Sequence, residues 1–135
     1  METRIIYVSR QGNSFNLRLR DSEGHDPGNN DITTLVDSGD IVQWVLDPNA
    51  NPPAQPGYFP IASIEGIFNS DPNSSPKYRG SIQLLTGDPT KVDGVWTGYV
   101  LSPSPGSGKF ENYAINYTVP GDPTIRSDDP RIQVN

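Results

Sequence analysis

Short segments in which apolar and polar residues alternate constrain this chain most, because loops rich in Gly and Pro separate them. An alternation of period two places successive side chains on opposite faces of a strand. The pattern therefore predicts strands with one buried and one solvent-exposed face. In residues 15–20 the inward residues are Phe15, Leu17 and Leu19, and in residues 113–119 they are Tyr113, Ile115, Tyr117 and Val119.

The same pattern along the whole chain predicts an all-β fold of about eight or nine short strands. Such a count is typical of a two-sheet antiparallel Greek-key sandwich, here a single domain over residues 1–135. An immunoglobulin-like strand order is the alternative. The expected strands cover residues 5–8, 15–20, 32–36, 41–46, 58–64, 81–85, 95–101, 113–119 and 131–134, with a hairpin-type connection over 87–94 and a Pro-rich loop over 47–57.

The composition excludes several classes of function. The chain carries 16 acidic and 10 basic residues, and its formal net charge of -6 disfavours contact with nucleic acid or an anionic membrane surface. It has no Cys, so disulfides and thiolate chemistry are excluded. We expect no membrane span and no signal peptide, because no apolar run is long enough. The expected location is therefore the cytoplasm, or the outside by a non-classical export route.

Three stretches together resemble the cupredoxin-like fold, a Greek-key sandwich found in copper-binding electron carriers. They are residues 39–44 (Gly-Asp-Ile-Val-Gln-Trp), residues 113–117 (Tyr-Ala-Ile-Asn-Tyr) and the closing residues 129–134. The resemblance implies a first His ligand after the Trp44 strand, and a Cys with a second His near the end. The chain has Pro-Ile-Ala at 60–62 and Thr-Val at 118–119 instead. We therefore expect the frame without its copper and without electron transfer.

The loop over residues 21–31 holds the one candidate metal site. Hard oxygen ligands in a flexible loop suit calcium, although the spacing does not match the EF-hand pattern. The alternative is a solvated turn, because Asp and Asn side chains bond their own backbone in loops. The loop also holds the only histidine, His25, for which we expect an exposed loop position. The candidate calcium residues are Asp21, Glu23, Asp26 and Asp31.

No pair of residues predicts an enzyme: there is no nucleophile elbow around a serine, and the acidic residues stand mostly at turn positions. The sequence predicts no cofactor. Aromatic residues that flank loops are the candidates for exposed contacts, since most other rings belong to inward faces. These candidates are Tyr58, Phe59 and Tyr78.

Two functional hypotheses follow. The first is a non-catalytic structural or interaction domain that binds protein, most simply itself, as an oligomer or within a larger assembly. The short terminal segments 5–8 and 131–134 are expected at sheet edges, where strands pair with other chains, so a Pro at Gln133 is expected to disrupt assembly. The second is a carbohydrate-binding module that uses the loop aromatics, with calcium as an option.

Overall fold

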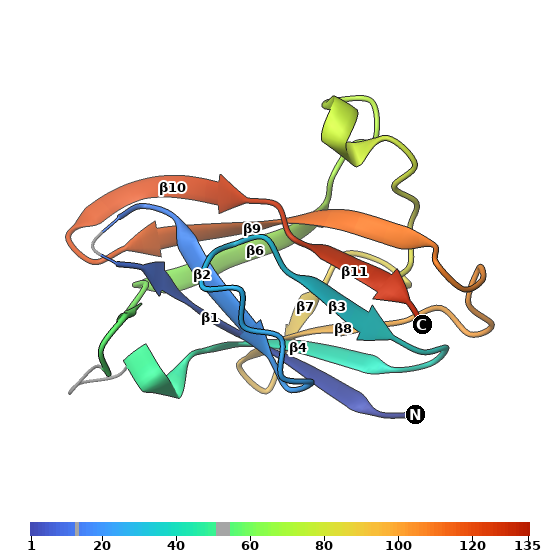
Figure 1. Cartoon of the computed structure of the whole chain (residues 1–135), viewed down its shortest axis with the longest axis horizontal. Helices are drawn as coiled ribbons and strands as arrows, with labels where there is room; N and C mark the ends of the chain where they lie inside the picture. The colour runs from blue at the N-terminus through green and yellow to red at the C-terminus, as the bar shows by residue number, and fades with distance from the viewer. Residues whose placement is uncertain (13, 51–54) are drawn as a thin grey trace.

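Two mixed β-sheets pack face to face as a sandwich, which confirms the all-β prediction (Figure 1). The structure is a computed structural model that describes residues 1–12, 14–50 and 55–135. The predicted loop over 47–57 therefore lies partly outside the described residues. Both chain termini lie at the same end of the sandwich (Figure 1).

The first sheet has six strands in the order β2-β1-β4-β8-β7, with β5 beside β1. The second has five strands in the order β10-β9-β11-β3, with β6 beside β9. The first sheet contains β1 (Thr3–Gln11), β2 (Leu17–Asp21), β4 (Ile41–Leu46), β5 (Tyr58–Phe59), β7 (Thr90–Val92) and β8 (Val95–Tyr99). The second contains β3 (Thr33–Val36), β6 (Ser63–Asn69), β9 (Phe110–Val119), β10 (Asp122–Asp128) and β11 (Arg131–Val134). Two single-turn 3-10 helices are η1 (Pro48–Ala50) and η2 (Pro76–Tyr78).

The expectation of purely antiparallel sheets is wrong, because β4 runs parallel to β1 and β11 runs parallel to β3. Consecutive segments of the chain lie in different sheets at these points. β1 and β2 form an antiparallel pair, the chain then crosses to β3 in the other sheet, and the turn at 37–40 returns it to β4. A segment that crosses and returns in this way can lie beside an earlier strand in the same direction.

A contact between Trp44 of β4 and Tyr113 of β9 joins the two sheets at the centre of the core. The indole N–H of Trp44 donates to the Tyr113 hydroxyl at 3.1 Å, and the rings meet edge to face with centroids 5.4 Å apart. Both side chains are buried, so the hydrogen bond gives the indole N–H an acceptor where water cannot reach it. Ile6, Val8, Leu17, Leu19, Val42, Ile115, Tyr117 and Ile132 surround them.

The alternation rule fails at the ends of two predicted strands. Leu17 and Leu19 are buried as expected, but Phe15 is 52% exposed and lies before β2, with the Arg126 guanidinium 3.7 Å from its ring centroid. Leu46, the last residue of β4, is exposed although Val42 and Trp44 on the same face are buried. At both positions the facing sheet no longer covers the strand.

The predicted strand over residues 81–85 does not form. Apart from a bridge between Leu85 and Val100, this segment is irregular. The backbone N–H groups of Leu84 and Leu85 donate to the side chain of Glu111 instead of to a neighbouring strand. The described residues form eleven strands, more than predicted, because the short strands β5 and β7 and the turn-rich β10 are also paired.

The hairpin over 87–94 is tighter than the sequence predicts. β7 and β8 are joined by Asp93 and Gly94 alone, with φ of 51° and 81°. A two-residue turn with positive φ at both positions matches the right-handed twist of the strands, and Asp-Gly is a favoured pair for it. The local sequence therefore determines this register.

Asp-Pro dipeptides account for much of the loop structure. The Oδ1 atoms of Asp47, Asp71 and Asp122 each accept the backbone N–H two residues further on, at 2.8–2.9 Å, and a Pro occupies the position between. The proline donates no hydrogen bond there and restricts the backbone to a turn. The carboxylates at these sites stabilise turns, Asp71 in an exposed loop and Asp47 in a buried position where it also pairs with Arg20.

The terminal strands are not sheet edges, which corrects the sequence-based expectation. β1 lies between β2 and β4, and β11 lies between β9 and β3. Gln133 faces Leu35 on one side and Phe110 on the other. The ends of the chain are therefore parts of the folded sheets and are not available for pairing with another chain.

We expect Gln133→Pro to destabilise the fold itself. The proline removes a ladder N–H in the interior of a sheet, and each buried polar group left unpaired costs about 1–3 kcal/mol. Urea unfolding measures the loss. Ile125→Pro is the matched control, because Ile125 lies in a bulged stretch of β10 between the paired positions 122 and 126. A small effect at position 133, equal to that at position 125, would contradict the interior placement of β11.

Candidate functional site

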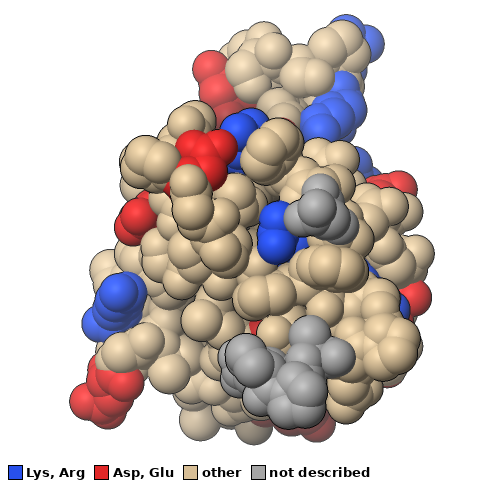
Figure 2. Space-filling view, turned by 90° about the vertical axis from the view of Figure 1, so that its left-hand side faces the viewer, with Lys and Arg blue, Asp and Glu red and all other residues tan. Residues whose placement is uncertain are grey.

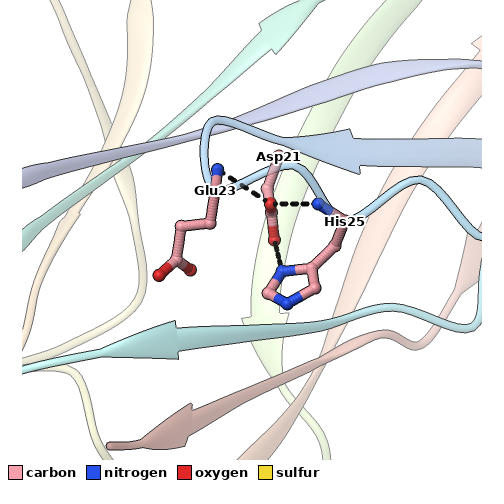
Figure 3. A group of neighbouring side chains, drawn as sticks. All are labelled: Asp21, Glu23 and His25. Carbon is pink, nitrogen blue, oxygen red and sulfur yellow. Dashed lines mark hydrogen bonds and ion pairs between the residues drawn. The ribbon is translucent and has the colours of Figure 1, made fainter.

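Figure 3 shows the part of the predicted calcium loop that the structure brings together. Ligand atoms of Asp21, Glu23 and His25 lie within 4.8 Å of one another. Asp21 ends β2, and the other two residues follow in the turn, where Gly24 adopts φ of 93°. Two of the four predicted residues therefore meet, and His25, which the sequence places only in an exposed loop, joins them.

The carboxylate of Asp21 is fully occupied by protein donors. Its Oδ1 accepts the backbone N–H groups of Glu23 and His25, and its Oδ2 accepts the hydroxyl of Thr34 and the Nδ1 of His25 at 2.8 Å (Figure 3). A carboxylate offers about four lone-pair positions, and here all four are used. Asp21 therefore serves as the link between β2, the following turn and β3.

The carboxylate of Glu23 is also engaged within the protein. Its Oε1 accepts the backbone N–H of Leu35, and its Oε2 accepts the Arg4 guanidinium at 3.0 Å. A divalent cation would have to displace these partners at both carboxylates. Within the described residues these bonds make the cluster a hydrogen-bonded support for the loop.

The remaining two residues of the predicted calcium set lie elsewhere. Asp26 pairs with the Arg18 guanidinium at 3.3 Å and accepts the hydroxyl of Tyr58. Asp31 continues a short turn in which its own N–H donates to the Asn29 side chain. Neither belongs to the group around Asp21 among the described residues.

His25 is held in one tautomer by Asp21, which directs its other ring nitrogen outward. With Nδ1–H donating to the carboxylate, Nε2 points away from the cluster (Figure 3). The ring lines an open depression of about 500 Å³ together with Pro27, Ile32 and Leu35. Activation of a protein nucleophile by Nε2 would require a hydroxyl or thiol within hydrogen-bond reach, and the described residues show no such bond to Nε2.

The three aromatic residues predicted as exposed contacts have different positions. The Arg18 guanidinium covers one face of the half-buried Tyr58 ring at 4.0 Å, and Phe59 is exposed beside Arg10. Tyr78 is buried, which corrects the expectation of exposure. Burial and the hydrogen bond to Asp129 raise the pKa of Tyr78 to about 12, and its ring supports the η2 turn.

The sheet edges are the other sites at which this fold can meet a partner. Two of them are capped by the chain itself. The outward N–H groups of Leu19 and Asp21 on β2 donate to carbonyls of the 25–29 loop, and that of Leu35 on β3 donates to Glu23. Self-capping of this kind prevents the pairing of an edge with another chain.

Three further edges are less protected, and on β6 the Asn69 N–H donates to the Asp88 side chain at 3.3 Å. β7 is three residues long and carries Lys91 at its centre, and β10 contains Pro123 and a bulge. Short length, charge, proline and bulges each discourage pairing. β6 is seven residues long, and among the described strands it pairs with β9 alone. β6 and β10 both flank residues 115–117 of β9, so they lie on opposite sides of it.

An apolar groove opens beside the first residues of β6. Trp44, Leu46 and Trp96 line it from the inner face of the first sheet, and Ile64 lines it from β6, around a volume of about 350 Å³. Trp96 is partly buried, with the Lys91 ammonium 5.6 Å from its ring centroid.

Figure 2 shows one end of the sandwich, where acidic and basic side chains are scattered over a mostly uncharged surface.

The sequence did not predict that residues 65–69 form an edge strand. Strand prediction identified an apolar run over 58–64, but β6 starts at Ser63 and continues to Asn69. The alternation is broken by a bulge between Ile64 and Gly66, so Phe68 lies on the outer face and is 46% exposed. Gly66 carries the one available signal, because a glycine inside an apolar run indicates a bulge.

The helices described, η1 and η2, are single turns, so no helix within the described residues has the length and apolarity to cross a membrane. A comparison with models of known protein families finds no match for this chain. None of the curated proteins is similar to it either. The function proposed below therefore rests on the sheet edges and side-chain contacts of the chain itself.

Arg4 connects the loop cluster to the start of β4 through a buried ion pair. Its Nε donates to Asp40 at 3.0 Å, and its other nitrogens reach Glu23, Asp37 and Glu2. Burial alone would raise the pKa of Asp40, but N–H groups of Asp37 and Glu2 and the Arg4 guanidinium lower it below its ordinary value of 3.8. The ionised carboxylate is therefore the form that the fold stabilises.

Because the folded pKa of Asp40 lies below the unfolded one, its contribution to stability is present above about pH 4. It is lost as the pH falls through the folded value. We expect Arg4→Met to cost about 3–5 kcal/mol at neutral pH, because it leaves a buried carboxylate unpaired, and to flatten the acid limb of stability. Urea unfolding at pH 2 to 7 measures both. Arg126→Met is the control, since Arg126 forms a partly exposed pair with Asp122 and its loss should change the acid limb of stability much less.

Proposed function

We propose that this chain is a non-catalytic structural or interaction domain that self-assembles, or joins a larger assembly, through the open edge of β6. In this proposal the sandwich is a cupredoxin-like frame without copper ligands. The observation that carries it is the edge itself: seven residues with one neighbouring strand, and an exposed Phe68. Open edges are templates for pairing with another chain.

The backbone of β6 has groups directed away from β9. The N–H of Ser70 donates to the Asn112 carbonyl of β9, whereas that of Asn69 donates to the Asp88 side chain. Backbone groups alternate sides along a strand, so those of Ile67 face the same way as those of Asn69. An added strand would bond at Ile67, and at Asn69 it would replace the long 3.3 Å bond to Asp88.

Pairing of β6 with β6 of a second copy is favoured by charge. A two-fold antiparallel register centred on Ile67 places Glu65 opposite Asn69 and Gly66 opposite Phe68. Glu65 is the one charged residue of this strand, so no like charges meet. The same operation on β10, centred on Ile125, places Asp122 opposite Asp128, and on β7 it places Lys91 opposite itself. Like charges directly opposite destabilise a sheet.

The exposed phenyl ring adds a second reason. In the monomer the Phe68 ring lies over Gly66, so closely that a Cβ on Gly66 would meet it at 2.5 Å. In the two-fold register each Gly66 faces the Phe68 of the other copy, and the pair of rings can cover both glycines. Burial of the apolar ring would stabilise the pairing by about 25 cal/mol per Å².

The carbohydrate-binding alternative has less support. Stacking on a sugar requires an open ring face, but Arg18 covers one face of Tyr58, and Tyr78 is buried. Phe59 alone of the three is exposed. One accessible ring without a second beside it is a weak platform for a sugar.

We expect light scattering over a range of concentrations to show a multimer, and Phe68→Lys to shift it toward monomer. The lysine removes the apolar contact and places a charge opposite Gly66 of the other copy. A tenfold or greater weakening corresponds to about 1.4 kcal/mol or more. Ile125→Lys is the control, because it changes a 60% exposed residue on another edge strand in the same way.

A multimer that responds to position 125 and ignores position 68 would refute pairing through β6. A wild-type chain that is monomeric at every concentration would refute self-assembly. Circular dichroism of both variants checks that the sandwich remains folded.

A further inference from the structure

Glu111 is a buried carboxylate without a cation beside it. It lies near the start of β9, is 2% exposed, and has no ion pair to any described Lys, Arg or His. Its Oε1 accepts the N–H groups of Leu84 and Leu85 at 2.7 and 3.2 Å. These two bonds replace the strand pairing that segment 81–85 lacks, so the position of Glu111 is fixed from one side.

The other side of Glu111 faces a polar cavity of about 250 Å³. The rest of its lining comes from Asn69, Gln83, Gly87 and Asp88. In the described parts of the chain no hydrogen bond or ion pair reaches Oε2 of Glu111. A side chain that is almost wholly buried thus presents an unpartnered oxygen to this cavity.

A second carboxylate shares the cavity. Asp88 accepts only a long bond of 3.3 Å from the N–H of Asn69, and no described cation pairs with it. Asp88 is exposed whereas Glu111 is buried, so a cation held between them would neutralise the carboxylate that water reaches least.

Neutral oxygen donors complete the lining. The Nε2 of Gln83 donates to the Leu85 carbonyl at 2.7 Å, which leaves its Oε1 without a hydrogen-bonding role. The amide of Asn69 lines the same space. Two carboxylates with amide oxygens form a set of hard ligands, and the cavity has no nitrogen or sulfur ligand that would favour zinc.

We propose that the cavity between the end of β6, segment 83–88 and the start of β9 binds calcium. Glu111 and Asp88 supply the charged oxygens, and Asn69, Gln83 and water complete the coordination. Calcium suits this set because it accepts six to eight oxygens in irregular geometry, whereas magnesium needs a near-ideal octahedron. Bound calcium would tie the irregular segment to the sheets.

The cluster at Asp21 and Glu23 provides the contrast. There every carboxylate oxygen already has a protein donor, including an Arg4 nitrogen. At Glu111 and Asp88 one oxygen of each carboxylate, Oε2 and Oδ2, has no protein donor among the described residues. We therefore expect calcium to choose the second group.

The test is thermal unfolding of the full chain with calcium chloride or with chelator, together with terbium luminescence excited through tryptophan. We expect calcium to raise the Tm in a concentration-dependent way, since a ligand that binds only the folded state stabilises it. Glu111→Gln keeps an oxygen for Leu84 and Leu85 but removes the charge. It should weaken calcium binding by more than about tenfold.

Asp88→Asn serves as the second variant if Glu111→Gln fails to fold, because Asp88 is exposed. It should lose the calcium response in the same way. Asp71→Asn is the matched control, an exposed turn carboxylate outside the cavity that should keep the full response. No Tm shift and no terbium signal from the wild-type chain would overturn the proposal. So would a response that both cavity variants retain, or a Glu111→Gln variant more stable than wild type under every condition.

Discussion

The hydrogen bond and edge-to-face contact between Trp44 and Tyr113 is the point on which the two sheets depend. It joins β9, which has the most neighbouring strands in the second sheet, to β4, which runs parallel to β1 in the first sheet. Because the Trp44 N–H finds its acceptor in the Tyr113 hydroxyl, the indole can be fully buried without an orphaned donor of its own. The packing leaves little room on β8 behind the indole, where Gly98 stands and a Cβ would lie 3.4 Å from Trp44. The register of three strands is therefore set around one pair of rings.

The sequence predicts the sandwich and most of its core because alternation reports directly on burial in half-buried strands. It fails where side chains replace backbone partners. Residues 81–85 look like a strand, but Glu111 takes two of their N–H groups. The sequence did contain evidence that Glu111 is buried. In an alternating strand it lies an even number of residues from Tyr113, Ile115 and Tyr117, so it belongs to the same inward face. Parallel pairing and edge positions could not be predicted, because they depend on which sheet receives each segment. Of the four residues of the predicted calcium loop, Asp21 and Glu23 lie together, and their partners Arg4 and Thr34 come from strands that the sequence does not place beside the loop.

The acidic character of the chain has two physical origins in this structure. Turn carboxylates such as Asp47, Asp71 and Asp122 accept backbone N–H groups and cost little, since they remain near solvent or, at Asp47, pair with Arg20. Asp21, Glu23 and Asp40 are embedded in donors. Glu111 and Asp88 belong to neither group, because each has one oxygen without a protein donor among the described residues. Acidic residues therefore have different roles in different parts of this fold. Net charge alone does not distinguish these cases.

The loop between β2 and β3 protects two edges at once. Its carbonyls cover β2, and its Glu23 covers β3, so the integrity of this one surface segment keeps both sheets closed on that side. Surface loops of this kind are where proteases cut. A single cleavage in this loop would therefore expose two unpaired strands in a chain that otherwise stays folded, and the nicked protein would be prone to aggregation. The acidic loop thus connects β2 to β3 and also prevents both strands from pairing with another chain.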